Sequence, residues 1–392
     1  MRPWSTTKVP WPGARRFENT DVVPHYLLTS HDGFGLGHVR RSMLIGNALL
    51  EREPESRVTI FTGVAAEPKW LANRGFDVVR VPALLKEGDG SYANGDMPFH
   101  SVVAQRAETF DSLVRDGRPD VVIVDRHPFG TAGELRTGIE RAARQGASVV
   151  LGLRDVLDEA DRVHAEIAGD GWAGVAELFS AIFVYGDRSL CDQMAEYGLP
   201  LKPRYCGWVT TAPTHRVRRD EFELIIAAGG GGDGEPTFDL GASLVARRPP
   251  WRGTVLAGPY AGAWLDRRPD VHGRLALSRN VDGCSSFFAR AGAVIQMAGY
   301  NSTAEAIAAG IRPILVPRRS PRREQAIRAS RLSALGLADV VDEGADVSEI
   351  GWLLDRPRTL DVGACERAGI RLDGAHRAAK RLSRLVAAAA SR

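Results

Sequence analysis

The sequence predicts an α/β protein with two doubly wound parallel-sheet domains that face a central cleft. Its 392 residues exceed one ordinary domain, and two domains of roughly 150 to 200 residues each are the natural expectation. Short apolar runs alternate with helical stretches along the chain, as in repeated βαβ units. In each half, an apolar run leads directly into a glycine-rich turn. This order favours parallel sheets, because parallel strands need helical crossovers.

Composition excludes several other classes of protein. The formal charge of +3 and the pI of about 8.7 are too mild to indicate a nucleic-acid-binding protein. The four cysteines are far apart and form no C-x-x-C pair, so we expect neither a zinc site nor a disulfide framework. No apolar run is long enough to cross a membrane, and the N-terminus lacks a signal-peptide core. We therefore expect a cytoplasmic protein.

The first domain is expected over residues 24–212, after an irregular N-terminal extension at 1–23 that is rich in proline and charge. Its strands are expected at 25–30, 57–62, 77–81, 120–125, 148–153 and 181–185. The polar segment 82–99 predicts a long loop at the strand edge, in a position to cover an acceptor. A short β-like run at 203–209 precedes the domain junction.

The loop after the first strand, at 31–37, contains three alternating glycines and leads into a helix that starts near His38. Its pattern G-x-G-x-G-H differs from the dinucleotide fingerprint, and the next strand ends in Thr-Gly rather than in an acid, so NAD binding is not expected. The helix dipole favours a neutral His38 that can accept a proton. The alternative is a histidine that only caps the helix. His31 and Asp32 are rival bases in the same loop.

Two further carboxylates follow buried strands of the first domain. Asp125 ends the apolar run 120–125, at the carboxyl edge of the expected sheet. It could orient an active-site histidine or serve as a base itself, and it could equally cap the next helix. Asp155, after the following strand, has the same alternatives.

The second domain, expected over residues 213–362, opens with a strand at 222–228 that runs into four consecutive glycines. Each glycine costs backbone entropy on folding, so that packing alone explains this run poorly. A nest of N–H groups around a diphosphate explains it better. The glycines are Gly229, Gly230, Gly231 and Gly232. Further strands are expected at 253–257 and 339–341, an apolar segment at 287–291 should complete the sheet, and an Ala/Arg-rich helix should follow at 365–389.

Residues 293–316 predict a parallel βαβ unit. An apolar run at 293–297 passes through a turn at Gly299 into an alanine-rich helix, and a second apolar run follows at 311–316. The turn therefore lies at the carboxyl edge of the sheet, where open α/β sheets bind ligands and a helix N-terminus attracts an anion.

Polar side chains gather at this turn. Asn301, Ser302 and Thr303 offer amide and hydroxyl groups to phosphate oxygens. Glu305, one turn into the helix, could accept hydrogen bonds from ribose hydroxyls. It could instead form a capping box with Ser302, which requires no ligand.

The motif G-x-x-x-x-x-E-x-x-A-A-G-x-x-P-I-L-V-P over residues 299–317, followed by Glu324 and Gln325, resembles the donor-binding signature of GT-B glycosyltransferases, specifically the MurG-like branch (glycosyltransferase family 28). The resemblance covers most of residues 25–350 and implies two Rossmann-like domains. In that family, the carboxylate that matches Glu305 holds the ribose of a UDP-sugar. The polar pair that matches Glu324 and Gln325 contacts the sugar hydroxyls.

The resemblance also assigns other positions. It implies that Gly37 and His38 lie under the acceptor and the donor diphosphate, that Gly229 to Gly232 face the phosphates, and that Val281 contacts the base. It implies a last helix, within 363–392, that packs back across the hinge. In two places the sequence departs from the family: Met297 stands where an arginine is usual, and Asp233 where a serine or glutamine is usual. Phosphate charge would then be neutralised by other groups, and the candidates are Arg318, Arg319, Arg322 and Arg323.

The resemblance implies an inverting glycosyltransferase that moves a sugar from a nucleotide diphosphate sugar, UDP-sugar above all, to a small-molecule acceptor, in natural-product biosynthesis. His38, helped by Asp32 or Asp125, would take the acceptor proton. No D-x-D pair sits at a strand end, so no metal and no cofactor beyond the nucleotide sugar are expected. The alternatives are a UDP-sugar epimerase of the same architecture and a non-catalytic nucleotide-sugar-binding partner protein. The sequence is compatible with a homodimer but does not predict one.

Overall fold

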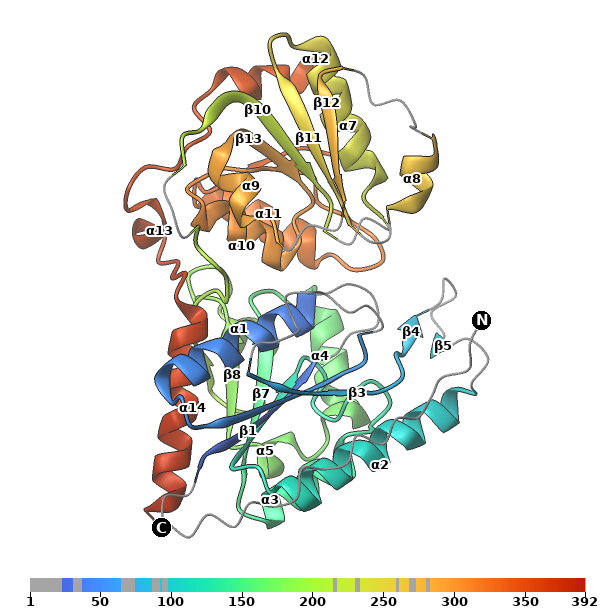
Figure 1. Cartoon of the computed structure of the whole chain (residues 1–392), viewed down its shortest axis with the longest axis vertical. Helices are drawn as coiled ribbons and strands as arrows, with labels where there is room; N and C mark the ends of the chain where they lie inside the picture. Colours follow the sequence, from blue (N-terminus) through green and yellow to red (C-terminus); the bar gives the residue numbers. More distant parts are fainter. Residues whose placement is uncertain are drawn as a thin grey trace.

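The computed structural model of the chain has two α/β domains, each built on its own parallel sheet (Figure 1). It describes residues 23–30, 37–64, 75–86, 92–93, 98–213, 217–229, 233–258, 261–267, 273–279 and 283–391. This arrangement confirms the fold class that the sequence predicts. Among the described residues, no helix is both long enough and apolar enough to span a lipid bilayer.

The first domain is a seven-stranded sheet with the order β3-β2-β1-β6-β7-β8-β9, parallel throughout. Its strands are β1 (His25–Ser30), β2 (Arg57–Thr62), β3 (Asp77–Arg80), β6 (Val121–Asp125), β7 (Ser148–Arg154), β8 (Ala181–Tyr185) and β9 (Pro203–Tyr205). Its helices are α1 (Gly37–Arg52), α2 (Phe99–Gly117), α3 (Arg136–Arg144), α4 (Ala160–Ala168), η1 (Asp170–Trp172), α5 (Val175–Leu178) and α6 (Gln193–Tyr197). Every residue of β1, β6 and β8 is buried, because helices cover the sheet and leave neither face to solvent.

The second domain is a six-stranded sheet with the order β12-β11-β10-β13-β14-β15, also parallel. Its strands are β10 (Asp220–Ala227), β11 (Arg252–Ala257), β12 (Leu275–Arg279), β13 (Ala291–Gln296), β14 (Ile314–Leu315) and β15 (Asp339–Val340). The helices that follow are α7 (Glu235–Arg247), α8 (Gly262–Arg267), α9 (Ser285–Arg290), α10 (Tyr300–Ala308), α11 (Glu324–Ala334), α12 (Val347–Ile350), η2 (Gly351–Asp355), α13 (Ala364–Arg367) and α14 (Gly374–Ala390). The predicted βαβ unit is present as β13, α10 and β14.

Three local expectations were wrong, and one strand was missed. The apolar segment 287–291 was expected to add to the sheet, but most of it belongs to helix α9. The edge strand β12 was not expected, because its sequence LALSR alternates weakly and is only partly buried. The strand expected at 311–316 pairs only over Ile314–Leu315, since Pro313 has no N–H for a ladder bond. The last helix is two helices, α13 and α14, separated by residues 368–373.

The segment 82–99 is described only in part. It contains the short antiparallel pair β4 (Leu85–Lys86) and β5 (Tyr92–Ala93). Its remaining polar residues, at 87–91 and 94–97, lie outside the described residues, as do residues 1–22 of the N-terminal extension.

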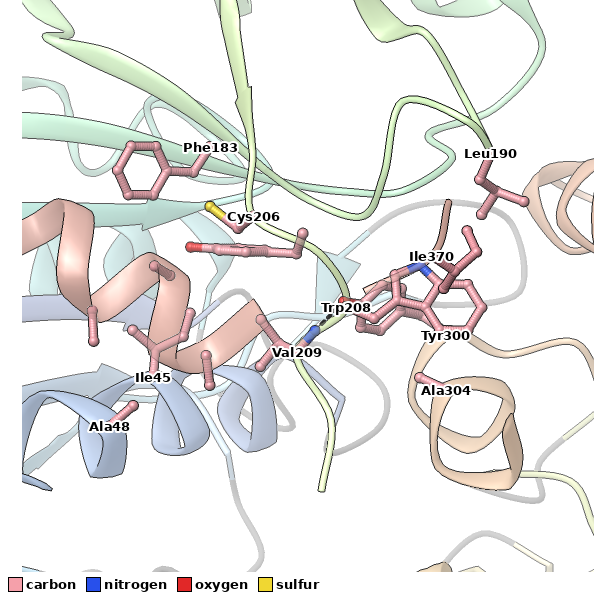
Figure 2. Close-up of a cluster of buried hydrophobic side chains, with 14 of the residues drawn as sticks. Ile45, Ala48, Phe183, Leu190, Cys206, Trp208, Val209, Tyr300, Ala304 and Ile370 are labelled. Atoms are coloured by element: carbon pink, nitrogen blue, oxygen red, sulfur yellow. Dashed lines mark hydrogen bonds between the residues drawn. The ribbon is translucent and has the colours of Figure 1, made fainter. Parts of the chain in front are cut away.

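A buried cluster joins the two domains around Trp208 and Tyr300. The two rings meet edge to face with centroids 6.2 Å apart, and the Tyr300 hydroxyl accepts a hydrogen bond of 2.9 Å from the Val209 amide (Figure 2). Helix α14 begins against the same segment, where a Cβ on Gly374 would lie only 2.4 Å from the Gly207 carbonyl oxygen. Only glycine permits this approach. From there α14 runs along α1 of the first domain (Figure 1).

Candidate active site

His38 and Asp125 meet at the carboxyl edge of the first sheet. His38 is the second residue of α1, and Asp125 is the last residue of β6. The His38 Nδ1 atom lies 2.6 Å from Asp125 Oδ2, and the histidine side chain keeps 17% of its surface exposed while the aspartate keeps 5%. Of the roles left open for Asp125, which were to orient a histidine, to act as a base or to cap the next helix, the geometry therefore favours orienting a histidine.

Arg41 holds the other side of this carboxylate. Its Nη2 donates to both Asp125 oxygens, at 2.6 and 2.7 Å, and its guanidinium lies over the rings of Tyr185 and Tyr300. The same Nη2 lies 3.1 Å from His38 Nδ1. The ionised Asp125 carboxylate can only accept hydrogen bonds, so its 2.6 Å contact with His38 requires the proton on Nδ1, and charge strengthens this bond. The lone pair of the neutral ring is then on Nε2, the atom that can accept a proton.

The charge on Asp125 is fixed by these neighbours. Burial raises the pKa of a carboxyl group, but here the charge of Arg41 and the hydrogen bonds from His38 and Arg41 outweigh burial and lower the pKa of Asp125 well below its usual range. Asp125 is therefore ionised at every physiological pH, and it is suited to orient His38 rather than to take up a proton itself.

The turn of the second domain faces this pair. Helix α10 begins at Tyr300 with Gly299 as its N-cap, and the Asn301 side chain donates a 3.0 Å hydrogen bond to the Gly37 carbonyl of the first loop. Asn301 and Ser302 are partly exposed, whereas the Thr303 side chain is fully buried and its hydroxyl has no partner among the described residues. The N-terminus of α10 therefore lies directly beside the first turn of α1.

Glu305 does not cap its own helix. Its Oε1 lies 2.8 Å from Nη2 of Arg40, in the first domain, and its Oε2 accepts a 2.8 Å hydrogen bond from the Cys284 amide. The N-terminus of α10 has no side-chain cap, so the capping box with Ser302 is absent. The carboxylate instead links the two domains at the junction.

Glu324 and Gln325 open helix α11 and are both buried. Arg318 contacts both: its Nη2 donates to Glu324 Oε1 at 3.1 Å, and its amide donates to Gln325 Oε1 at 3.3 Å. The second oxygen of Glu324 is buried and has no hydrogen-bond partner among the described residues. The pair is thus preformed, with one acceptor left unsatisfied.

The four arginines proposed to neutralise phosphate are engaged with carboxylates. Arg318 also contacts Asp233 and so pairs the charge of that acid, and Arg319 contacts Asp342. Arg322 reaches Glu166 in α4 at 3.1 Å, and Arg323 reaches Glu159 at 2.6 Å. The last two therefore connect the domains.

Asp155 is likewise engaged. Arg328 of α11 donates to both of its oxygens, at 2.8 and 2.7 Å, and to the Ala298 carbonyl at 2.8 Å. Both side chains are almost completely buried, with exposures of 1% and 0%. This ion pair ties the end of the first sheet to the second domain.

Several predicted site residues lie outside the described residues. These are Asp32, Gly230, Gly231, Gly232 and Val281, together with the rival base His31. Gly229 is described: it follows β10 and has a φ of 57°, a left-handed conformation that glycine adopts readily.

Four arginines of the site escaped the sequence analysis. Arg40 and Arg41 immediately follow His38, and Arg126 and Arg154 stand at the ends of β6 and β7. Their positions could have indicated them, because each lies next to a candidate residue or to the end of a predicted strand. Because arginine is abundant in this chain, its presence alone carried no weight.

Comparison with known proteins places this geometry in a known fold. No protein-family model matches the chain, and no curated protein matches it. Solved structures do match. The glycotransferase of kitacinnamycin superposes with a TM-score of 0.63 at 15% identity, covering 95% of this chain and 98% of the other. The chain has the GT-B fold.

Other GT-B structures match it almost equally well. MurG of Acinetobacter baumannii matches with a TM-score of 0.55 at 14% identity, over 94% of this chain and 100% of MurG. A Listeria monocytogenes protein described as a candidate UDP-N-acetylglucosamine 2-epimerase matches with a TM-score of 0.60 at 12% identity, over 93% and 96%. At these identities the comparisons establish the fold, and they do not single out the MurG-like branch.

Proposed function

We propose that this GT-B chain is a glycosyltransferase that moves a sugar from a nucleotide diphosphate sugar to a small-molecule acceptor. UDP is the proposed nucleotide, and inversion at the anomeric carbon is the proposed stereochemistry. Residues 24–212 would bind the acceptor and residues 213–362 the donor. The likeness to the glycotransferase of kitacinnamycin supports a natural-product acceptor.

One observation carries the proposal: residues on either side of the candidate base contact the candidate donor site across the domain junction. The Asn301 side chain bonds the Gly37 carbonyl, one residue before His38, and Arg40 reaches Glu305. A ribose on Glu305 and a diphosphate at the start of α10 would therefore place the anomeric carbon near His38. Proximity of this kind is the main requirement of a group-transfer site.

In the proposed reaction, His38 Nε2 takes the proton of the acceptor hydroxyl, while Asp125 stabilises the imidazolium that forms. The acceptor oxygen attacks the anomeric carbon as the bond to the diphosphate breaks. The nucleotide diphosphate leaves with the electron pair, and N–H groups at the start of α10 and the Gly229–Gly232 loop would stabilise its charge.

The direct test is turnover. The protein should release UDP from a UDP-sugar only when a hydroxylated acceptor is present, and the product should carry the inverted anomeric configuration by NMR. A UDP-sugar epimerase is the second candidate, which the likeness to the Listeria protein supports. It would instead produce free epimer or its nucleotide sugar with no acceptor present. Tight donor binding without either reaction would favour a non-catalytic partner protein.

Glu305→Ala should weaken UDP-sugar binding by about 1 to 3 kcal/mol, the usual cost of losing a charged hydrogen-bond partner. Calorimetry with UDP-glucose measures the affinity, and Glu366→Ala, an exposed carboxylate on α13, is the control. If affinity is unchanged while the melting temperature falls, Glu305 serves only to hold Arg40 and the Cys284 amide.

Removal of metal should leave the transfer reaction intact. The proposed reaction neutralises the leaving diphosphate with N–H groups and needs no divalent cation. Turnover measured before and after treatment with EDTA, with added Mg²⁺ or Mn²⁺ as the comparison, checks this expectation. A strict requirement for either cation would refute the mechanism.

A further inference from the structure

Two arginines at the domain junction lack the close carboxylate partner that their neighbours have. Arg40, Arg41 and Arg328 each contact a carboxylate oxygen at 2.8 Å or less. Arg154, by contrast, forms no side-chain hydrogen bond or ion pair with any described residue, and its Nε atom is buried without a partner. The ion pair of Arg126 with Glu166 spans 3.7 Å, too long for a hydrogen bond.

The fold places these two residues next to Asp125, the hydrogen-bond partner of the candidate base. Arg126 follows Asp125 directly, and Arg154 is the last residue of β7. In the parallel pair of β6 and β7, Asp125 lies opposite Gly152, whose carbonyl accepts a 2.9 Å hydrogen bond from the Arg126 amide. Side chains alternate along a strand, so Arg154 emerges on the same face of the sheet as Asp125.

Burial leaves both guanidinium groups poorly satisfied. Burial first, and then the charge of Arg126, lowers the pKa of Arg154 to about 9. Burial, followed by the charge of Arg322, lowers the pKa of Arg126 as well. The negative charge of Glu324 raises the pKa of both arginines, but Glu324 forms no hydrogen bond with either of them. A buried cation without hydrogen bonds is costly, and an incoming anion would remove that cost.

Ligand access to this pair differs between its two members. Arg154 is partly exposed as a residue although its Nε atom is buried, whereas Arg126 is only 7% exposed. Arg126 has a φ of 71°, a left-handed conformation that is uncommon for a residue with a side chain. The backbone therefore turns at this residue, at the point where β6 ends beside the candidate base.

We propose that Arg126 and Arg154 form an anion subsite that binds a carboxylate or phosphate group of a substrate beside His38. This inference rests on the proposed glycosyltransferase function and names its substrate class. Both arginines belong to the first domain, which favours an acceptor that carries an acid group near its reacting hydroxyl. A uronic acid on the donor offers the same chemistry, and binding experiments separate the two sources.

Calorimetry with two matched pairs of probes tests the subsite. The acceptor pair is 4-hydroxybenzoate and 4-hydroxybenzamide, measured with UDP present, and the donor pair is UDP-glucuronate and UDP-glucose. In the unmodified protein, the acid of one pair should bind about tenfold more tightly than its neutral partner, the gain expected from one charged hydrogen-bonding contact. The pair that shows the difference identifies the source of the anion.

Arg154→Met should remove that preference while it leaves UDP-glucose affinity unchanged. Arg52→Met is the control, because Arg52 is exposed at the far end of α1, about 20 Å along the helix from His38, and should retain the preference. Equal affinity within both pairs, or a preference that survives in Arg154→Met, would overturn the proposal. These binding measurements need no turnover. Failure of every transfer assay would therefore refute the proposed function, and the binding measurements would still test the anion subsite.

Discussion

His38→Ala should lower turnover by about 10² to 10⁴, the range that a positioned general base contributes. Donor affinity should persist, because the imidazole is bonded to Asp125 of the first domain, whereas the donor is proposed to bind the second domain. UDP release in the presence of acceptor measures turnover, and calorimetry with a UDP-sugar measures donor binding. The two readouts together distinguish a lost base from a collapsed site.

The control for this substitution is His376→Ala. His376 is an exposed histidine on α14, and its contact with Glu51 is 3.7 Å long and at the surface. Turnover of this variant should match that of the unmodified protein. Undiminished turnover in His38→Ala would assign the proton to another group, and His31 and Asp32 of the same loop are the next to test.

Asp155→Ala should destabilise the protein by about 3 to 5 kcal/mol, the usual cost of leaving one member of a buried ion pair without its partner. Arg328 would retain only its bond to the Ala298 carbonyl, and its charge would stay buried at the junction of the domains. The melting temperature and urea unfolding measure the loss. Unfolding should also separate into two steps, since this pair ties the sheets together.

Two controls define the cause of that loss. Asp361→Ala removes an exposed ion pair with Arg367, for which a change of about 1 kcal/mol or less is expected. The double variant Asp155→Leu with Arg328→Met removes both buried charges, and it should recover much of the stability. If the double variant is as unstable as Asp155→Ala, the ion pair is not what the single substitution disrupts.

The strands were largely predictable because their signal is local. The expected ranges 25–30, 57–62 and 181–185 coincide with β1, β2 and β8, since a run of apolar residues buried on both faces is visible in any short window. The edge strand β12 escaped because half-exposed residues leave no such pattern. The break between α13 and α14 was missed although Gly369, with a left-handed φ of 68°, follows α13 as a stop signal.

The sequence predicted the positions of the candidate site residues, but it did not predict which of these residues contact each other. His38, Asp125 and Glu305 each stood at an edge that parallel sheets use for ligands. The role that each of Asp125 and Glu305 plays was left open, because a cap and a functional site have the same local sequence. The absence of a side-chain cap on α10 and the bond from His38 resolve both questions in favour of long-range partners.

By itself, the sequence determined two parallel α/β sheets and the turns at their carboxyl edges. The spacing of apolar residues and the residue preferences of turns depend only on residues close together in the chain. Only the tertiary structure decided which polar groups meet. Arg41 and Asp125 are 84 residues apart, and Asn301 and Gly37 are 264 apart. Contacts at such separations depend on how two whole domains pack, and no short window of sequence contains that information.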